Sequence, residues 1–160
     1  GASSLLVAAS EHIFEAELEP HSSSVRLGRS CAQPIYDTRQ TIYSLCSLGF
    51  TGQSLAFAAS ATDGSILVYR RHLSCSAAPP TPSVLRSQCN APAVHLLTCE
   101  DESHKFAALH DATTHMSPTT LLTPPHANAH TNAIVLWDAM RESRICEAYD
   151  PFERYEYIAI

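Results

Sequence analysis

Histidine is the side chain of this sequence most able to do chemistry, and several histidines gather in the second half of the chain. His126 and His130 are separated by three residues, a spacing that can hold zinc when both lie on one face of a helix. Pro124, Pro125 and Asn128 oppose a helix there, and no cysteine pair completes a ligand set. We therefore interpret these histidines as solvated loop residues and predict no metal and no cofactor.

A hydrolytic site can be drawn on paper from His12, or from His110 with Asp111, together with nearby serines. A serine nucleophile needs a turn such as G-x-S-x-G, and the sequence has none. It also lacks G-x-G-x-x-G and the phosphate-binding loop. Because no set of groups visibly converges, we predict that the chain is not an enzyme, and we identify no small-molecule substrate. A metal-dependent enzyme that uses loop histidines is the less favoured alternative.

The composition is that of a globular protein with few charges. The chain has 160 residues, of which 45% are hydrophobic and 16% charged, enough for one domain with a sizeable core. Its net charge of −6 gives no attraction to phosphate backbones, so nucleic acid is not an expected partner. No apolar run approaches the roughly 18 residues of a membrane span, so no membrane association is expected.

The cysteines bear on the compartment. Six are scattered along the chain, and none forms C-x-x-C. An even number in a secreted protein could form disulfides, but no secretory signal is visible. The apolar residues 5–9 are too few for a signal sequence and lack a basic flank. We expect reduced thiols in an intracellular protein, either cytoplasmic or nuclear.

The clearest structural signal is a β-hairpin around Asp63-Gly64, predicted as a two-residue turn between β-prone arms within residues 54–71. A weaker hairpin is predicted near 5–18. Its second arm alternates apolar and acidic residues, although Glu and Ala there also favour a helix. A third hairpin is predicted over 104–138. It is interrupted at 111–130 by an insertion rich in Thr, Pro and His, and a loop this long is often functional.

Single strands flank the hairpins, so the same order of strands recurs along the chain. They are expected at 24–30, 41–48, 83–88, 93–99, 143–149 and 155–160. A unit of one strand, a hairpin and a short closing strand would form a small four-stranded sheet. Repeats of such a sheet are typical of a β-propeller.

The repeat resembles the WD40 family. The residues that carry the resemblance are Asp63, Gly64, Ser65, Ile66 and Tyr69 in one hairpin and Ile134, Leu136, Trp137 and Asp138 in another. Asp63 stands six positions before Tyr69, where the family has Trp, and Thr131 stands six positions before Trp137, where the family often has Asp. The family's Gly-His pair is absent.

The resemblance implies an all-β chain of propeller blades, each of four antiparallel strands. About three blades are visible within residues 1–160, so we expect part of a larger propeller. Blades stack face to face, with Trp137 and Tyr69 as core anchors. Because the hydrogen-bond relay from the turn Asp to the Trp is incomplete, we expect rigidity from apolar packing.

The implied function is a non-catalytic scaffold or adaptor that binds other proteins within a complex. The alternative is a structural subunit whose propeller is completed by another chain. Candidate partner-binding residues are the insertion histidines and the C-terminal aromatics, namely His115, His126, His130, Tyr149, Phe152 and Tyr155. Arg70-Arg71, at the end of a hairpin arm, is predicted to be a solvated strand terminus.

Overall fold

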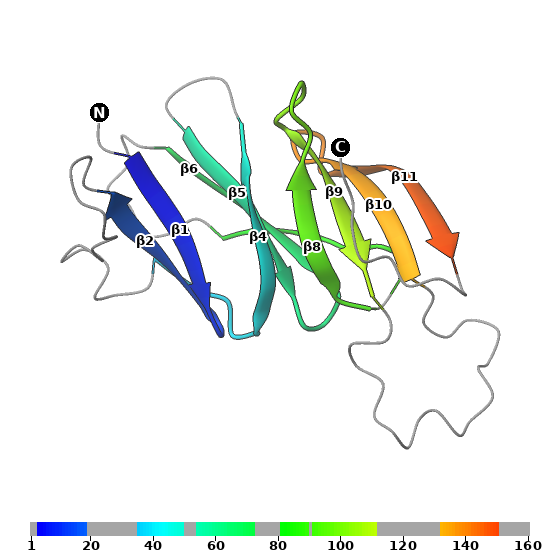
Figure 1. The fold of residues 1–160 in the computed structure, drawn as a ribbon, viewed down its shortest axis with the longest axis horizontal. Coiled ribbons are helices and arrows are strands. Elements are labelled where there is room, and N and C mark those ends of the chain that lie inside the picture. Colours follow the sequence, from blue (N-terminus) through cyan, green and yellow to red (C-terminus); the bar gives the residue numbers. More distant parts are fainter. Residues whose placement is uncertain are drawn as a thin grey trace, which may run out of the picture.

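The computed structural model describes residues 3–18, 35–49, 54–72, 81–89, 91–111 and 132–150. This part of the chain confirms the all-β prediction, since its strands form three antiparallel sheets and it contains no helix. The sheets follow one another in chain order and form an open stack rather than a closed ring (Figure 1). None of these residues forms a helix that is long and apolar enough to cross a membrane.

The first sheet contains β1 (Ser3–Ala9), β2 (His12–Leu18) and β3 (Tyr36–Asp37), in that spatial order. β1 and β2 pair antiparallel along their whole length, from Ser3↔Leu18 to Ala9↔His12. The alternating second arm is therefore a strand and not a helix, because its acidic residues recur with the period of two that a sheet requires. The predicted strand at 24–30 lies outside the described residues.

The middle sheet has the order β4-β5-β6-β7, with β4 (Ile42–Leu48), β5 (Ser54–Ala61), β6 (Ile66–His72) and β7 (Ser83–Leu85). β5 and β6 form the predicted hairpin, but the prediction of a two-residue turn at Asp63-Gly64 was wrong. The amide of Gly64 donates to the Ala61 carbonyl over 3.1 Å, so Thr62 and Asp63 are the central residues of the turn. Gly64 follows with φ of 81°, a conformation in which a Cβ would be strained.

The third sheet has the order β11-β10-β9-β8 and includes β8 (Ala93–Thr98) and β9 (Lys105–His110). β10 (Asn132–Asp138) pairs with β9 from Ala133↔His110 to Asp138↔Lys105, and with β11 (Ser143–Asp150) on its other side. The two arms of the third hairpin therefore meet across the predicted insertion. Apart from Asp111, that insertion lies outside the described residues, as does the strand expected at 155–160.

Both faces of the middle sheet are buried, because a sheet packs on each. Alternate residues of a strand point to opposite faces. Ala56 and Ala58 of β5 join a core shared with the third sheet, which includes Phe106 and Trp137. Phe57 and Ala59, and likewise Leu67 and Tyr69, join a second core with residues of the first sheet, among them Ile13 and Tyr36. The continuous apolar sequence of β5 is therefore explained by burial of the strand on both faces.

Backbone contacts also join the middle and third sheets directly. The amide of Gly49, just after β4, donates to the Ser103 carbonyl over 2.9 Å. A Cβ at Gly49 would lie 2.5 Å from the Ser103 Cβ, so only glycine allows this approach. Ser44 on β4 accepts the Leu96 amide through its hydroxyl at 3.0 Å. The two sheets are therefore held at close range along their neighbouring strands.

Candidate functional site

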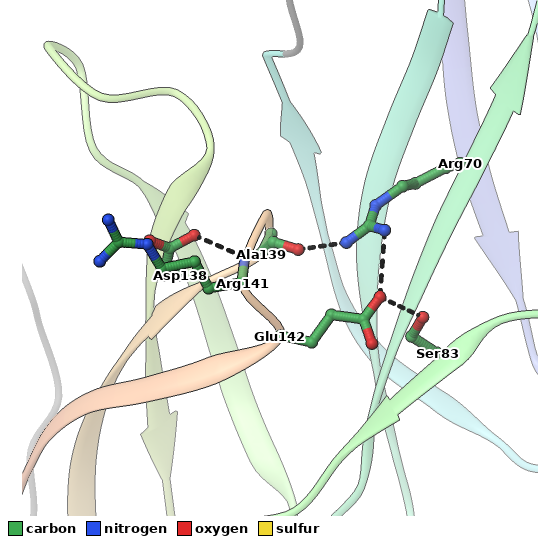
Figure 2. Close-up of polar contacts among 6 residues, drawn as sticks. All are labelled: Arg70, Ser83, Asp138, Ala139, Arg141 and Glu142. Atoms are coloured by element: carbon green, nitrogen blue, oxygen red, sulfur yellow. Dashed lines mark hydrogen bonds and ion pairs between the residues drawn. The ribbon is translucent and has the colours of Figure 1, made fainter.

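The main polar cluster between two sheets lies where the end of β6 and the start of β7 meet the turn between β10 and β11. Figure 2 shows its members reaching toward one another from these elements. The turn comprises residues 139–142. The amide of Ala139 donates to the His104 carbonyl over 2.9 Å, which ties the turn to the neighbouring β8–β9 connection.

Asp138 shapes the turn. Its Oδ1 accepts the backbone amide of Arg141 over 3.0 Å, and this hydrogen bond is the main cause that holds the pKa of the Asp138 carboxyl below its usual value. Glu142 has φ of 53°, in the left-handed region that non-glycine residues rarely occupy. The Asp of the Trp-Asp pair therefore caps a hairpin turn, as Asx side chains commonly do.

The middle sheet holds this turn through Arg70. The Arg70 guanidinium donates to the carbonyl of Ala139, a fully buried residue, and its Nη1 lies 3.0 Å from Glu142 Oε1. Ser83 Oγ donates to the same Glu142 oxygen over 2.7 Å. We call Arg70, Ser83, Ala139 and Glu142 the clamp. The prediction that Arg70 is a solvated strand terminus was wrong, because the turn of the next sheet reaches its side chain.

Beyond the clamp, the turn carries Met140 and Arg141 at its tip. Met140 is 59% exposed, and the Arg141 side chain is 82% exposed. The Arg141 Nε lies 3.7 Å from Asp138 Oδ2, a loose contact that leaves the guanidinium open to solvent. The clamp thus holds a rigid turn whose two outermost side chains are an apolar thioether and a cation.

The second polar feature is the Asp63 turn. Asp63 Oδ1 accepts the amide of Ser65 over 2.9 Å and also its hydroxyl, while Oδ2 pairs with Arg86 at 2.9 Å. Partial burial opposes ionisation of this carboxyl. The hydrogen bonds from Ser65, Gln40 and Arg86 outweigh it and lower the Asp63 pKa to about 2. Asp63 therefore fixes its own turn and ties it to Arg86, the residue just after β7.

The aromatic positions of the repeat are buried. Tyr69 stacks on Phe57 at 4.8 Å between ring centroids and lies 4.1 Å from Tyr36, and burial raises its pKa to about 12. Trp137 packs in the core shared with the middle sheet, and its Nε1 has no hydrogen-bond partner. Ile66 is buried and Ile134 half-buried. Trp137 is thus held by apolar contact.

The candidate binding residues are only partly placed. Tyr149 is exposed on β11, whereas His115, His126, His130, Phe152 and Tyr155 lie outside the described residues. His110 is fully buried, with Nδ1 2.7 Å from the Ala91 carbonyl and no partner for Nε2. Within the described ranges no three His, Cys, Asp or Glu side chains gather as a metal site, and Cys46, Cys99 and Cys146 are free thiols.

Sequence reasoning missed the clamp and the tip. Arg70 and Ala139 are 69 residues apart, and Ser83 and Glu142 are 59 apart, so no local spacing links them. The one local signal was the pair Met140-Arg141, which follows Trp137-Asp138 after a single residue. Comparison of the chain with protein-family models and with curated proteins finds no match.

Proposed function

We propose that the chain is a non-catalytic scaffold that binds other proteins, and that its sheets are blades of a WD40-like propeller within a larger ring. The observation that carries the proposal is the clamped turn, which offers Met140 and Arg141 to solvent from a rigid frame. Met and Arg are enriched in protein interfaces relative to the rest of the protein surface.

The clamp supports a binding role because it lowers the entropy lost on association. A turn that is already fixed loses less conformational freedom when a partner contacts it. The Arg141 guanidinium remains available, since its contact with Asp138 is long. Arg can form two parallel hydrogen bonds to a carboxylate, so the partner surface would combine an apolar contact for Met140 with an acidic group for Arg141.

The propeller part of the proposal is supported by the middle sheet. It is a four-stranded antiparallel meander with another sheet on each face, the stacking expected of blades. The aromatic residues in the second arms of two hairpins have equivalent places, because Tyr69 and Trp137 each pack toward the preceding sheet. The free thiols in the described part of the chain suit a reducing, intracellular setting.

The scaffold proposal is tested by affinity purification of the tagged chain, followed by quantitative mass spectrometry. We expect protein partners in stoichiometric amounts, and their loss from a Met140→Ser/Arg141→Ala double variant that unfolds like the wild type. Val84→Ser is the matched control, because Val84 is an exposed apolar residue of β7 that points to the opposite face of the strand from Ser83 of the clamp. Recovery of no stoichiometric partner, or equal recovery with the tip variant, would refute the proposal.

The open stack of sheets favours a second candidate, a structural subunit whose propeller another chain completes. In an incomplete ring each terminal sheet has one face without a neighbouring sheet to cover it, and a second chain could bury that face. Sedimentation of the purified chain separates the two candidates. A stable monomer at micromolar concentration supports the scaffold, whereas a chain that remains soluble only with a second protein supports the completed ring.

A further inference from the structure

Each sheet has two edge strands, the first of which is β1, β4 or β8, and we call the strand that comes last in the chain its outer edge. The outer edge of the third sheet differs from those of the other two. The first and middle sheets end in β3, of two residues, and β7, of three residues. Short edge strands of this kind prevent pairing with other chains. The third sheet ends in β11, which has eight residues and is the outermost strand in Figure 1. Its length alone makes it a template for another strand.

The side chains of β11 do little to protect this edge. Ile145 and Tyr149 are exposed large apolar residues, and Cys146 is an exposed free thiol. The charges of Arg144 and Glu147 are paired with each other. Within the described ranges, β10 is the only strand that pairs with β11. Among these residues, no strand therefore occupies the far side of β11.

We propose that β11 binds an extended peptide segment of a partner protein, which adds to the third sheet as a fifth strand. Backbone hydrogen bonds along the edge would supply affinity, and alternate side chains would supply selectivity. This surface is separate from the tip of the β10–β11 turn, and the proposal rests on the scaffold function. It assigns β11 to one class of partner, an unstructured segment that becomes ordered on binding.

The two faces of the edge define the chemistry of that segment. Cys146 and Ala148 lie opposite Leu136 and Ile134 of β10, which are half-buried. Because Cys146 and Ala148 are small, large apolar side chains of an added strand can lean over them toward β10. The other face carries Tyr149 and the neutralised Arg144–Glu147 pair. The segment should therefore alternate apolar residues with uncharged polar ones.

A flexible peptide suits this edge better than the rigid edge of a second copy. The register between β10 and β11 shifts at Leu136/Trp137, which is a β-bulge. A bulge bends a strand and increases its twist, so two rigid bulged edges would not stay in register. A free segment can follow the twist as it binds.

The test uses the 160-residue chain and a fluorescein-labelled peptide, as long as β11, in which valine and threonine alternate. Two further peptides carry N-methyl groups on one or the other set of alternate amides. Only one set can face β11, so we expect saturable binding in fluorescence anisotropy and a loss of at least tenfold for one methylated peptide only. Ala148→Lys should weaken binding at least tenfold, whereas Val84→Lys on β7 should not.

Three outcomes would overturn the proposal. They are equal binding of the two methylated peptides, unchanged binding by Ala148→Lys, and occupation of the edge by self-association in sedimentation. Circular dichroism of each variant separates lost binding from lost folding, and the methylated peptides need no variant at all. The peptide assay uses purified components and no cellular partner, so its failure would leave the co-purification test of the scaffold function open.

Discussion

The clamp should depend more on the buried carbonyl of Ala139 than on the ion pair with Glu142. Arg70→Met keeps the aliphatic stem but removes every hydrogen-bond donor that Arg70 extends to the turn. Glu142→Gln removes the negative charge but keeps an oxygen that can accept from Ser83. Comparison of these two variants with the double variant separates the two contacts of Arg70.

The exposed fractions of the side chains set the expected losses of unfolding free energy. Arg70 and Glu142 are 38% and 42% exposed in their side chains, so solvent screens the pair and Glu142→Gln should cost only about 0.2–1 kcal/mol of unfolding free energy. Ala139 is fully buried, and a buried carbonyl left without its donor costs about 1–3 kcal/mol. Arg70→Met also removes the ion pair, so it should cost at least that much. The coupling free energy between the two substitutions should then be at most about 1 kcal/mol.

Urea unfolding of the four proteins, at low salt and at about 1 M NaCl, measures these quantities. High salt should reduce the loss for Glu142→Gln and leave most of the loss for Arg70→Met. A dominant role for the Ala139 carbonyl would be refuted if Glu142→Gln cost as much as Arg70→Met, or if high salt abolished the effect of both.

Three further predictions concern the core and the turns. Trp137→Phe should cost less than half of the about 3–5 kcal/mol expected for Trp137→Ala, because the indole N–H has no partner to lose. Equal losses in thermal unfolding would contradict packing as its main role. Asp63 has a lowered pKa, so it stabilises the fold above its ordinary value of 3.8, and this contribution disappears as the pH falls to about 2. Asp63→Asn should therefore reduce the slope of unfolding free energy against pH between about pH 2 and 3.8. An unchanged slope would count against the turn hydrogen bonds. Burial lowers the pKa of His110 below 6.5 despite its hydrogen bond to Ala91, so below pH 6.5 the unfolded chain binds a proton that the folded chain resists. His110→Phe should lessen the loss of stability on acidification from about pH 7.5 to 5.5, and parallel curves for variant and wild type would refute this.

Much of the strand order could be predicted, because its signals are local. Alternation predicted β2, and the apolar arms around Asp63-Gly64 predicted β5 and β6. The turn itself was misplaced, since Asp-Gly is compatible with several turn types and the hydrogen bond from Gly64 to Ala61 selects one of them. Local patterns thus indicate where a chain reverses but not the register of the reversal.

The candidate site could not be predicted in the same way. Whether Arg70 is solvated or clamped depends on which sheet lies beside the end of β6, and its charge and position in the strand are the same in both cases. The exposed β11 edge likewise has an ordinary strand sequence. It becomes a candidate surface only when β3 and β7 are seen to close the other sheets with very short strands.

The sequence by itself determined the class of structure, because the spacing of apolar residues and turn formers acts over a few residues. It also determined that Trp137 and Tyr69 would be buried, as large aromatics in apolar strands. Only the tertiary structure decided which residues of the neighbouring sheets cover the two faces of the middle sheet and that Gly49 must lie against Ser103. It also decided that Arg70 holds the turn at Ala139, because these contacts join strands whose sequences carry no record of one another.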